Sequence, residues 1–112
     1  MAYDEGLAER IREVLQADAP VTEKKMFGGL AFLFGGYMFV GIAQDRLMAR
    51  AGPAGYEQAL GLPHTREMDF TGKPMRGYVY VDPPGFEEDA DLEAWVRRCL
   101  RFVETLPPKG IT

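Results

Sequence analysis

The side chain with the greatest nucleophilic potential is the thiol of Cys99, the only cysteine in the sequence. Arginines flank it at positions 97, 98 and 101, and nearby cations lower a thiol pKa and so favour the reactive thiolate. Cys99 also falls on the apolar stripe of a predicted helix, together with Trp95 and Val103. A cysteine in such a stripe usually behaves as a small core residue. We therefore expect Cys99 to pack in the core, and we assign no catalytic residue.

The sequence gives only weak indications of a metal site or of a phosphate-binding loop. His64 is the one histidine and has no cysteine or histidine partner at ligand spacing. Glu67 and Asp69 are two residues apart, which places both carboxylates on one strand face, but no third oxygen ligand lies nearby in sequence. The segment Thr71-Gly72-Lys73 is followed by Pro74 and does not complete a phosphate-binding loop. The sequence therefore predicts no metal and no cofactor.

Basic and aromatic residues are concentrated in the middle of the chain, although the net charge is −4. If several share one sheet face, they form a local positive patch with exposed rings. The residues that we predict as an interaction surface are Lys24, Lys25, Arg46, Arg50, Lys73, Arg76, Phe39, Tyr78 and Tyr80.

Hydrophobic periodicity and turn residues give the elements that must position these groups. Helical spacing of apolar residues predicts helices over 4–17, 53–61 and 89–105, and alternation predicts strands over 24–34, 37–43, 46–50, 66–70 and 76–81. Gly35-Gly36 and Gln44-Asp45 suit tight hairpin turns, whereas Gly28-Gly29 is expected to mark a bulge or bend within a strand.

The resulting order, α-β-β-β-α-β-β-α, predicts an α+β two-layer sandwich in which the first and last helices cover one face of an antiparallel sheet. With 112 residues, one domain over 1–112 is expected, with a flexible tail at about 107–112. The chain has no signal peptide pattern and no apolar run long enough to span a membrane. One cysteine and this composition predict a cytoplasmic protein without a membrane partner.

Several segments together resemble the TfoX N-terminal domain family, also called Sxy N-terminal. The resemblance rests on M-F-G-G-L at 26–30 and M-D-F-T-G-K-P-M-R-G at 68–77, and it extends over 25–33, 36–41, 47–50, 68–81, 95–96 and 106–109. It implies the family's two-layer fold, α-β3-α-β2-α, which is similar to that of secretion chaperones.

The resemblance also implies a class of function. Full-length members are regulators of natural competence that act on transcription with the cyclic-AMP receptor protein, and they carry a second, helix-hairpin-helix domain. This sequence ends at Thr112, so we expect a stand-alone domain that binds a protein partner or forms a homodimer, and does not read DNA directly. Two alternatives stay open, namely a small-ligand binder or enzyme with a pocket near Cys99, and a weak nucleic-acid binder that uses a basic sheet face.

Overall fold

The computed structural model describes residues 3–16, 21–26, 28–68 and 76–107. The helices are α1 (Glu5–Leu15), α2 (Tyr56–Leu60), the 3-10 helix η1 (Pro83–Phe86) and α3 (Asp89–Glu104). The strands are β1 (Thr22–Met26), β2 (Gly29–Phe34), β3 (Tyr37–Ala43), β4 (Arg46–Arg50), β5 (Thr65–Glu67) and β6 (Tyr78–Val81).

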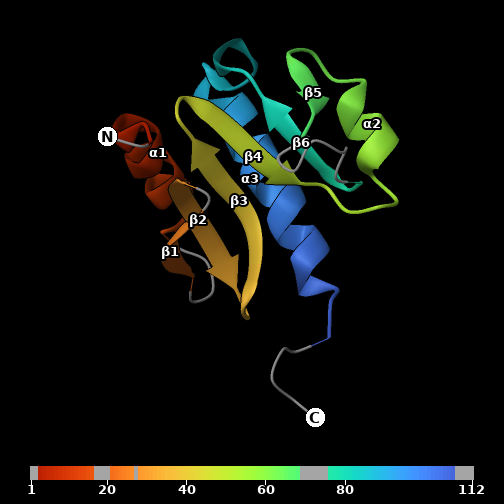
Figure 1. The fold of residues 1–112 in the computed structure, drawn as a ribbon, viewed down its shortest axis with the longest axis horizontal. Coiled ribbons are helices and arrows are strands. Elements are labelled where there is room, and N and C mark those ends of the chain that lie inside the picture. Colours follow the sequence, from red (N-terminus) through yellow and green to blue (C-terminus); the bar gives the residue numbers. More distant parts are fainter. Residues whose placement is uncertain (1–2, 17–20, 27, 69–75, 108–112) are drawn as a thin grey trace.

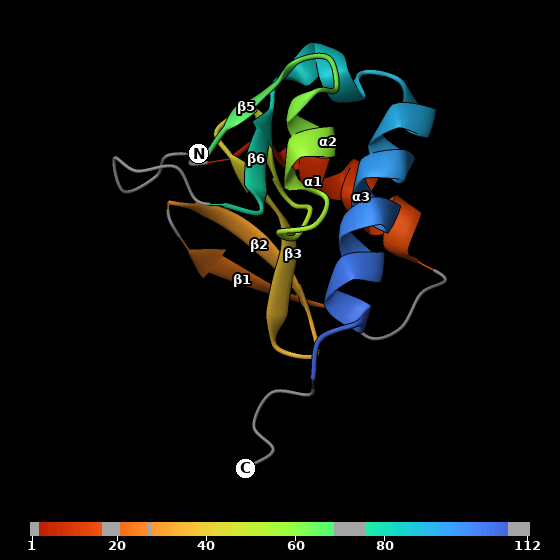
Figure 2. The same ribbon diagram turned by 90° about the vertical axis from the view of Figure 1, so that its right-hand side faces the viewer.

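Within the described residues, the strands form one antiparallel sheet in the order β1-β2-β3-β4-β6-β5. The helices lie on one face of this sheet, with α1 and α3 as the main covering layer (Figures 1 and 2). The predicted α+β two-layer sandwich is therefore confirmed. No helix in the described part of the chain is both long and apolar enough to cross a membrane.

The segment 24–34, expected to be one strand, is a hairpin of β1 and β2. Met26 pairs with Gly29, and Gly28 has a φ of +72°, which places it in the left-handed region that tight turns require. Position 29 requires glycine for another reason, because a Cβ there would lie 1.9 Å from the backbone oxygen of Ile42 in β3. The two glycines thus make a turn and a close strand approach, where we had expected a bulge or bend.

The other two hairpin turns were predicted correctly. Gly35 and Gly36 both have positive φ between β2 and β3, and Gln44 has a φ of +61° between β3 and β4. Positive φ at these positions matches the right-handed twist of the flanking strands.

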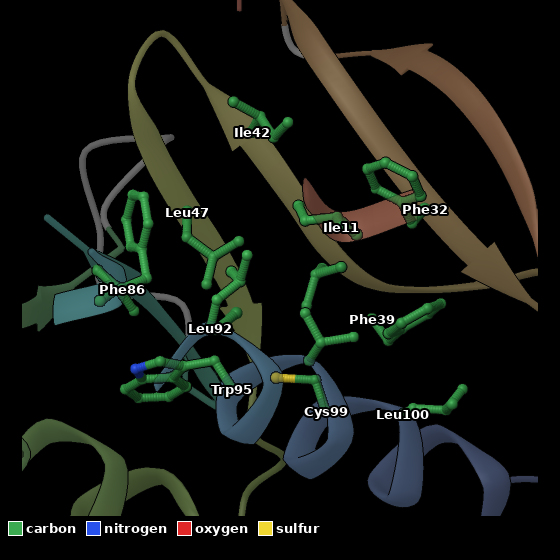
Figure 3. Packing of buried hydrophobic residues seen from close by; sticks show 14 of the residues in the cluster. Ile11, Phe32, Phe39, Ile42, Leu47, Phe86, Leu92, Trp95, Cys99 and Leu100 are labelled. Carbon is green, nitrogen blue, oxygen red and sulfur yellow. The ribbon is translucent and has the colours of Figure 1, made fainter. Parts of the chain in front are cut away.

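A continuous apolar core fills the space between the helices and the sheet (Figure 3). Helix α1 contributes Leu7, Ile11 and Leu15, and α3 contributes a stripe that includes Leu92, Trp95 and Cys99. The opposing sheet residues are Leu30, Phe32, Val40, Ile42, Leu47, Ala49, Val79 and Val81. The spacing of apolar residues in α1 and α3 therefore does specify which helix faces are buried.

A β-bulge in β3 moves Phe39 into this core. Phe32 pairs with Val40 but Leu33 pairs with Met38, so Phe39 is an extra residue without a partner in β2. Its exposed fraction is 0%, and Figure 3 shows its ring among the core side chains beside α3. The prediction that Phe39 belongs to an exposed surface is therefore wrong, because strict alternation fails at the bulge.

Candidate functional site

A second, smaller apolar cluster lies on the face of the sheet that the helices do not cover. It consists of Met48, Met68 and Tyr80, with Met38, Ala43 and Tyr78 packed against it. Met48 in β4 is paired with Tyr80 in β6 and with Gly41 in β3. Paired residues point to the same side of a sheet, so this row lies opposite the main core. We call this side the helix-free face.

Two arginines and one aspartate surround Tyr80 on the helix-free face. The guanidinium of Arg46 lies 4.5 Å from the centre of the Tyr80 ring, and that of Arg66 lies 5.6 Å from it. Arg66 also makes a two-pronged ion pair with Asp82, with Nε–Oδ2 and Nη2–Oδ1 distances of 3.0 and 2.9 Å. The hydrogen bonds from Arg66 are the main cause of the lowered pKa of Asp82, and Arg46 contributes through its charge.

Arg46 is the member of this group that keeps unused donor capacity. Its Nη2 donates a long hydrogen bond of 3.4 Å to Gln44 Oε1, whereas its Nε is buried with no hydrogen-bond partner. Buried polar groups are normally paired. The buried Nε cannot reach an outside partner, but the terminal guanidinium nitrogens of Arg46 make only this one long hydrogen bond within the described residues, so they can donate to an anionic or carbonyl group at this surface.

Arg50, by contrast, has a structural position at the end of β4. Its Nη1 donates to the backbone oxygen of Met38 at 3.3 Å. Its guanidinium lies 5.3–5.6 Å from the ring centres of Tyr37, Tyr78 and Phe102, the last of which comes from α3. Stacking among three rings fixes the side chain, so Arg50 links the sheet to α3 and is less available to a partner than Arg46.

The remaining predicted basic residues are not brought to one face. Lys24 pairs with Ala31 and lies on the helix-free face, whereas Lys25 pairs with Leu30 and points to the helix side. Arg76 lies 5.7 Å from the ring centre of Tyr56 in α2. Lys73 lies outside the described residues.

The helix-free face therefore contains Lys24, Arg46, Tyr78 and Tyr80 from the predicted surface, together with three residues outside it. These are Arg66, Asp82 and Met48. Arg66 and Asp82 are 16 residues apart and meet because β5 pairs with β6, as the two predicted strands 66–70 and 76–81 allow.

Charge is distributed unequally between the two layers. Most acidic residues lie on or directly before α1 and α3, at positions 4, 5, 9, 13, 87, 88, 89, 91, 93 and 104. The described residues placed on the helix-free face include three cations, Lys24, Arg46 and Arg66, and the acidic residue Asp82. The sheet side is therefore locally basic in a chain of net charge −4.

Cys99 is fully buried in the main core, and Figure 3 shows its sulfur among the side chains between α3 and the sheet. Burial raises the pKa of its thiol to about 12, although a hydrogen bond from the Arg50 backbone and the charge of Arg98 act in the opposite direction. The thiol is therefore protonated at neutral pH and has no access to a substrate, so Cys99 cannot serve as the nucleophile considered from the sequence.

The other candidate groups are not gathered into a metal-binding cluster in the part of the chain that the structure describes. Glu67 accepts a hydrogen bond of 3.4 Å from the hydroxyl of Tyr56, and Asp69 lies outside the described residues. Burial is the main cause of the raised pKa of Tyr56, and the charge of Glu67 adds to it. Over residues 3–16, 21–26, 28–68 and 76–107, no cluster of three or more acidic, histidine or cysteine side chains could hold a metal ion.

Comparison with known proteins gives one match. A family model described as the TfoX N-terminal domain matches residues 13–103, which includes the whole sheet and most of α3. Neither the curated proteins nor the solved structures gave a match.

Proposed function

Because the chain belongs to the TfoX N-terminal domain family, we propose that it is a non-enzymatic regulatory module that binds an acidic segment of a protein partner on its helix-free face. Under this proposal the module acts in the control of transcription, and the family suggests competence as the pathway. The cytoplasm is the compartment in which such a partner would be found.

The observation that carries the proposal is the arrangement around Tyr80. A small apolar cluster on the helix-free face is bordered by Arg46, whose terminal guanidinium makes only one long hydrogen bond within the described residues, and by the Arg66–Asp82 pair. Apolar contacts bordered by charged groups are typical of protein interfaces, in which arginine and tyrosine often contribute most of the binding energy. Lys24 extends the positive charge towards β1.

Two features favour an acidic protein over a nucleic acid as the partner. Binding to a phosphate backbone requires many cations that are free to neutralise phosphates, but Arg66 is already paired with Asp82 and Arg50 is stacked among aromatic rings. The acidic layer formed by α1 and α3 would also repel an extended polyanion. A short acidic segment needs only the local charge of Lys24 and Arg46.

The sheet edges are less suited to pairing with a second copy of the chain. The edge strand β1 has exposed lysines at both 24 and 25, and β5 at the other edge is only three residues long. Lysines and short edge strands are common devices that prevent strands from pairing between molecules. A homodimer formed through these edges is therefore disfavoured.

The test compares charge reversal on the two sides of one strand. Lys24→Glu changes the helix-free face, and Lys25→Glu makes the same charge change at an equally exposed neighbour on the helix side. Proteins captured from native lysate by the wild-type chain are identified, purified and titrated against the wild type, both variants and Arg46→Gln.

We expect the Lys24→Glu and Arg46→Gln variants to lose about tenfold or more in affinity for the identified partner, and Lys25→Glu to bind within about twofold of the wild type. Equal binding by the Lys24→Glu and Lys25→Glu variants would contradict the proposed face. A duplex DNA that binds at about 20 mM salt and is released by Lys24→Glu would favour nucleic acid instead.

A further inference from the structure

A separate pocket lies at the end of the molecule where the α2–β5 loop, η1 and α3 meet. Its volume is about 390 Å³, which is within the range of small-molecule sites. Figure 2 shows the α2–β5 loop and η1 next to one another at the top of the molecule, near the start of α3. The pocket is on the helix side, so it is independent of the helix-free face.

The pocket is lined by both apolar and polar side chains. Leu62, Pro84 and Trp95 are among the apolar ones, and His64, Asp91 and Arg98 supply the polar groups. Trp95 is only 6% exposed, so its indole is a fixed part of the wall. The walls come from three segments that are held by the main core, which indicates a site that exists before any ligand binds.

Arg98 is the cation best placed to hold a ligand. Its guanidinium carbon lies 5.7 Å from the centre of the Trp95 ring. Its positive charge also lowers the pKa of the adjacent Cys99 thiol, against the larger effect of burial. Arg98 is half-buried and takes part in no ion pair within the described residues. An arginine of this kind can donate two parallel hydrogen bonds to a carboxylate or phosphate.

Asp91 does not cancel this charge, because it lies seven residues earlier in α3. Seven residues correspond to about 10 Å along a helix axis. Asp91 forms no ion pair with Arg98 within the described residues and lines the same pocket, so its carboxylate can accept a hydrogen bond from a donor on the ligand.

The loop that carries His64 is held closely against η1. His64 has a φ of +65°, a left-handed conformation that is uncommon outside glycine, and its backbone oxygen accepts a hydrogen bond of 2.8 Å from Asp82 N. Gly85 lies beside it, since a Cβ at that position would be 2.6 Å from Val81 Cγ1 and 3.2 Å from His64 Cβ. These contacts fix the backbone of His64 where the loop borders the pocket.

From this arrangement we infer that the pocket binds a small organic anion with an apolar body. The carboxylate or phosphate of the ligand is held by Arg98, its body packs against Trp95, Leu62 and Pro84, and a donor at its far end meets Asp91. Recognition thus combines one charge-assisted contact with burial of an apolar ring or chain.

Trp95 is the only tryptophan in the chain and lines this pocket, so a ligand that binds there is expected to change its fluorescence. The wild-type protein is titrated with 3-phenylpropionate, phenyl phosphate and the neutral 3-phenylpropan-1-ol. We expect a saturable change with an anionic probe, with a dissociation constant of about 1 mM for a ligand of this size. The tighter of the two anions identifies the preferred anionic group.

The Arg98→Met variant is expected to bind the preferred anion about 10- to 100-fold more weakly. Arg101→Met is the matched control on the same helix, at an exposed position outside the pocket lining, and should leave binding unchanged. The inference is overturned if no probe gives a saturable change, or if the alcohol binds the wild type as tightly as both anions. It is also overturned if Arg98→Met and Arg101→Met bind alike.

Discussion

Replacing Phe39 tests directly whether the β3 bulge turns this ring into the core. The side chain is 0% exposed and lies among the apolar residues between the sheet and α3. A Phe→Ala change at such a site removes buried apolar surface and leaves a cavity, which costs about 3–5 kcal/mol. A domain of this kind has a total stability of about 5–15 kcal/mol. Phe39→Ala should therefore remain folded at room temperature with much of its stability lost.

The assay is urea unfolding followed by Trp95 fluorescence and by circular dichroism. Tyr78→Ala serves as the control, because Tyr78 is another strand aromatic but is partly exposed on the helix-free face. It should cost about 1–2 kcal/mol, since less surface is removed from water on folding. If Phe39→Ala loses no more stability than Tyr78→Ala, the ring is not in the core and the bulge is placed incorrectly. Loss of partner binding without loss of stability would lead to the same conclusion.

Three further predictions concern a glycine, an ion pair and the thiol. Gly29→Ala should lower the free energy of unfolding in urea by about 2 kcal/mol or more, because the new Cβ would lie 1.9 Å from a backbone oxygen. At Gly28 a Cβ meets nothing within 4 Å, so Gly28→Ala should cost only about 1–2 kcal/mol for its positive φ. Equal costs would contradict the close approach at Gly29. The pKa of Asp82 is lowered in the folded chain, so its stabilisation is present above its ordinary pKa of 3.8 and is lost as the pH falls through the lowered value. Asp82→Asn should thus be less stable than the wild type at pH 7 by about 0.5–1 kcal/mol, and this difference should shrink in acid; a difference independent of pH would count against the ion pair. Cys99 should react with a thiol reagent at a negligible rate in the native protein at pH 8 and fully in urea, because it is buried with a pKa of about 12; rapid native labelling would show that the thiol is accessible.

Local patterns were sufficient for most elements of the fold. The apolar spacing in α1 and α3 predicted their buried faces, because a helix repeats every 3.6 residues and its inward positions can be read directly from the sequence. The predicted start of this helix at residue 4 agrees with the structure, in which Asp4 caps α1 and its Oδ1 accepts a hydrogen bond of 3.2 Å from Leu7 N. The position of Cys99 on the α3 stripe likewise predicted that it is buried.

The sites depended on information that no local pattern contains. Lys24 and Lys25 are adjacent in sequence and were both assigned to one surface, but only the pairing of β1 with β2 decides which of them points away from the helices. The sequence left open a pocket near Cys99, but Cys99 is fully buried and the pocket lies beside Trp95, where Leu62, Pro84 and Arg98 from separate segments meet.

The sequence by itself thus determined the family, the two-layer class and the buried helix faces, because each of these is encoded in residues close together along the chain. Only the tertiary structure decided that Phe39 points into the core, that Arg66 forms an ion pair with Asp82 and that a pocket exists at Arg98. The physical reason is that a single extra residue in a strand reverses the alternation of side chains. Contacts between distant segments, in turn, exist only after the strand order β4-β6-β5 has been established.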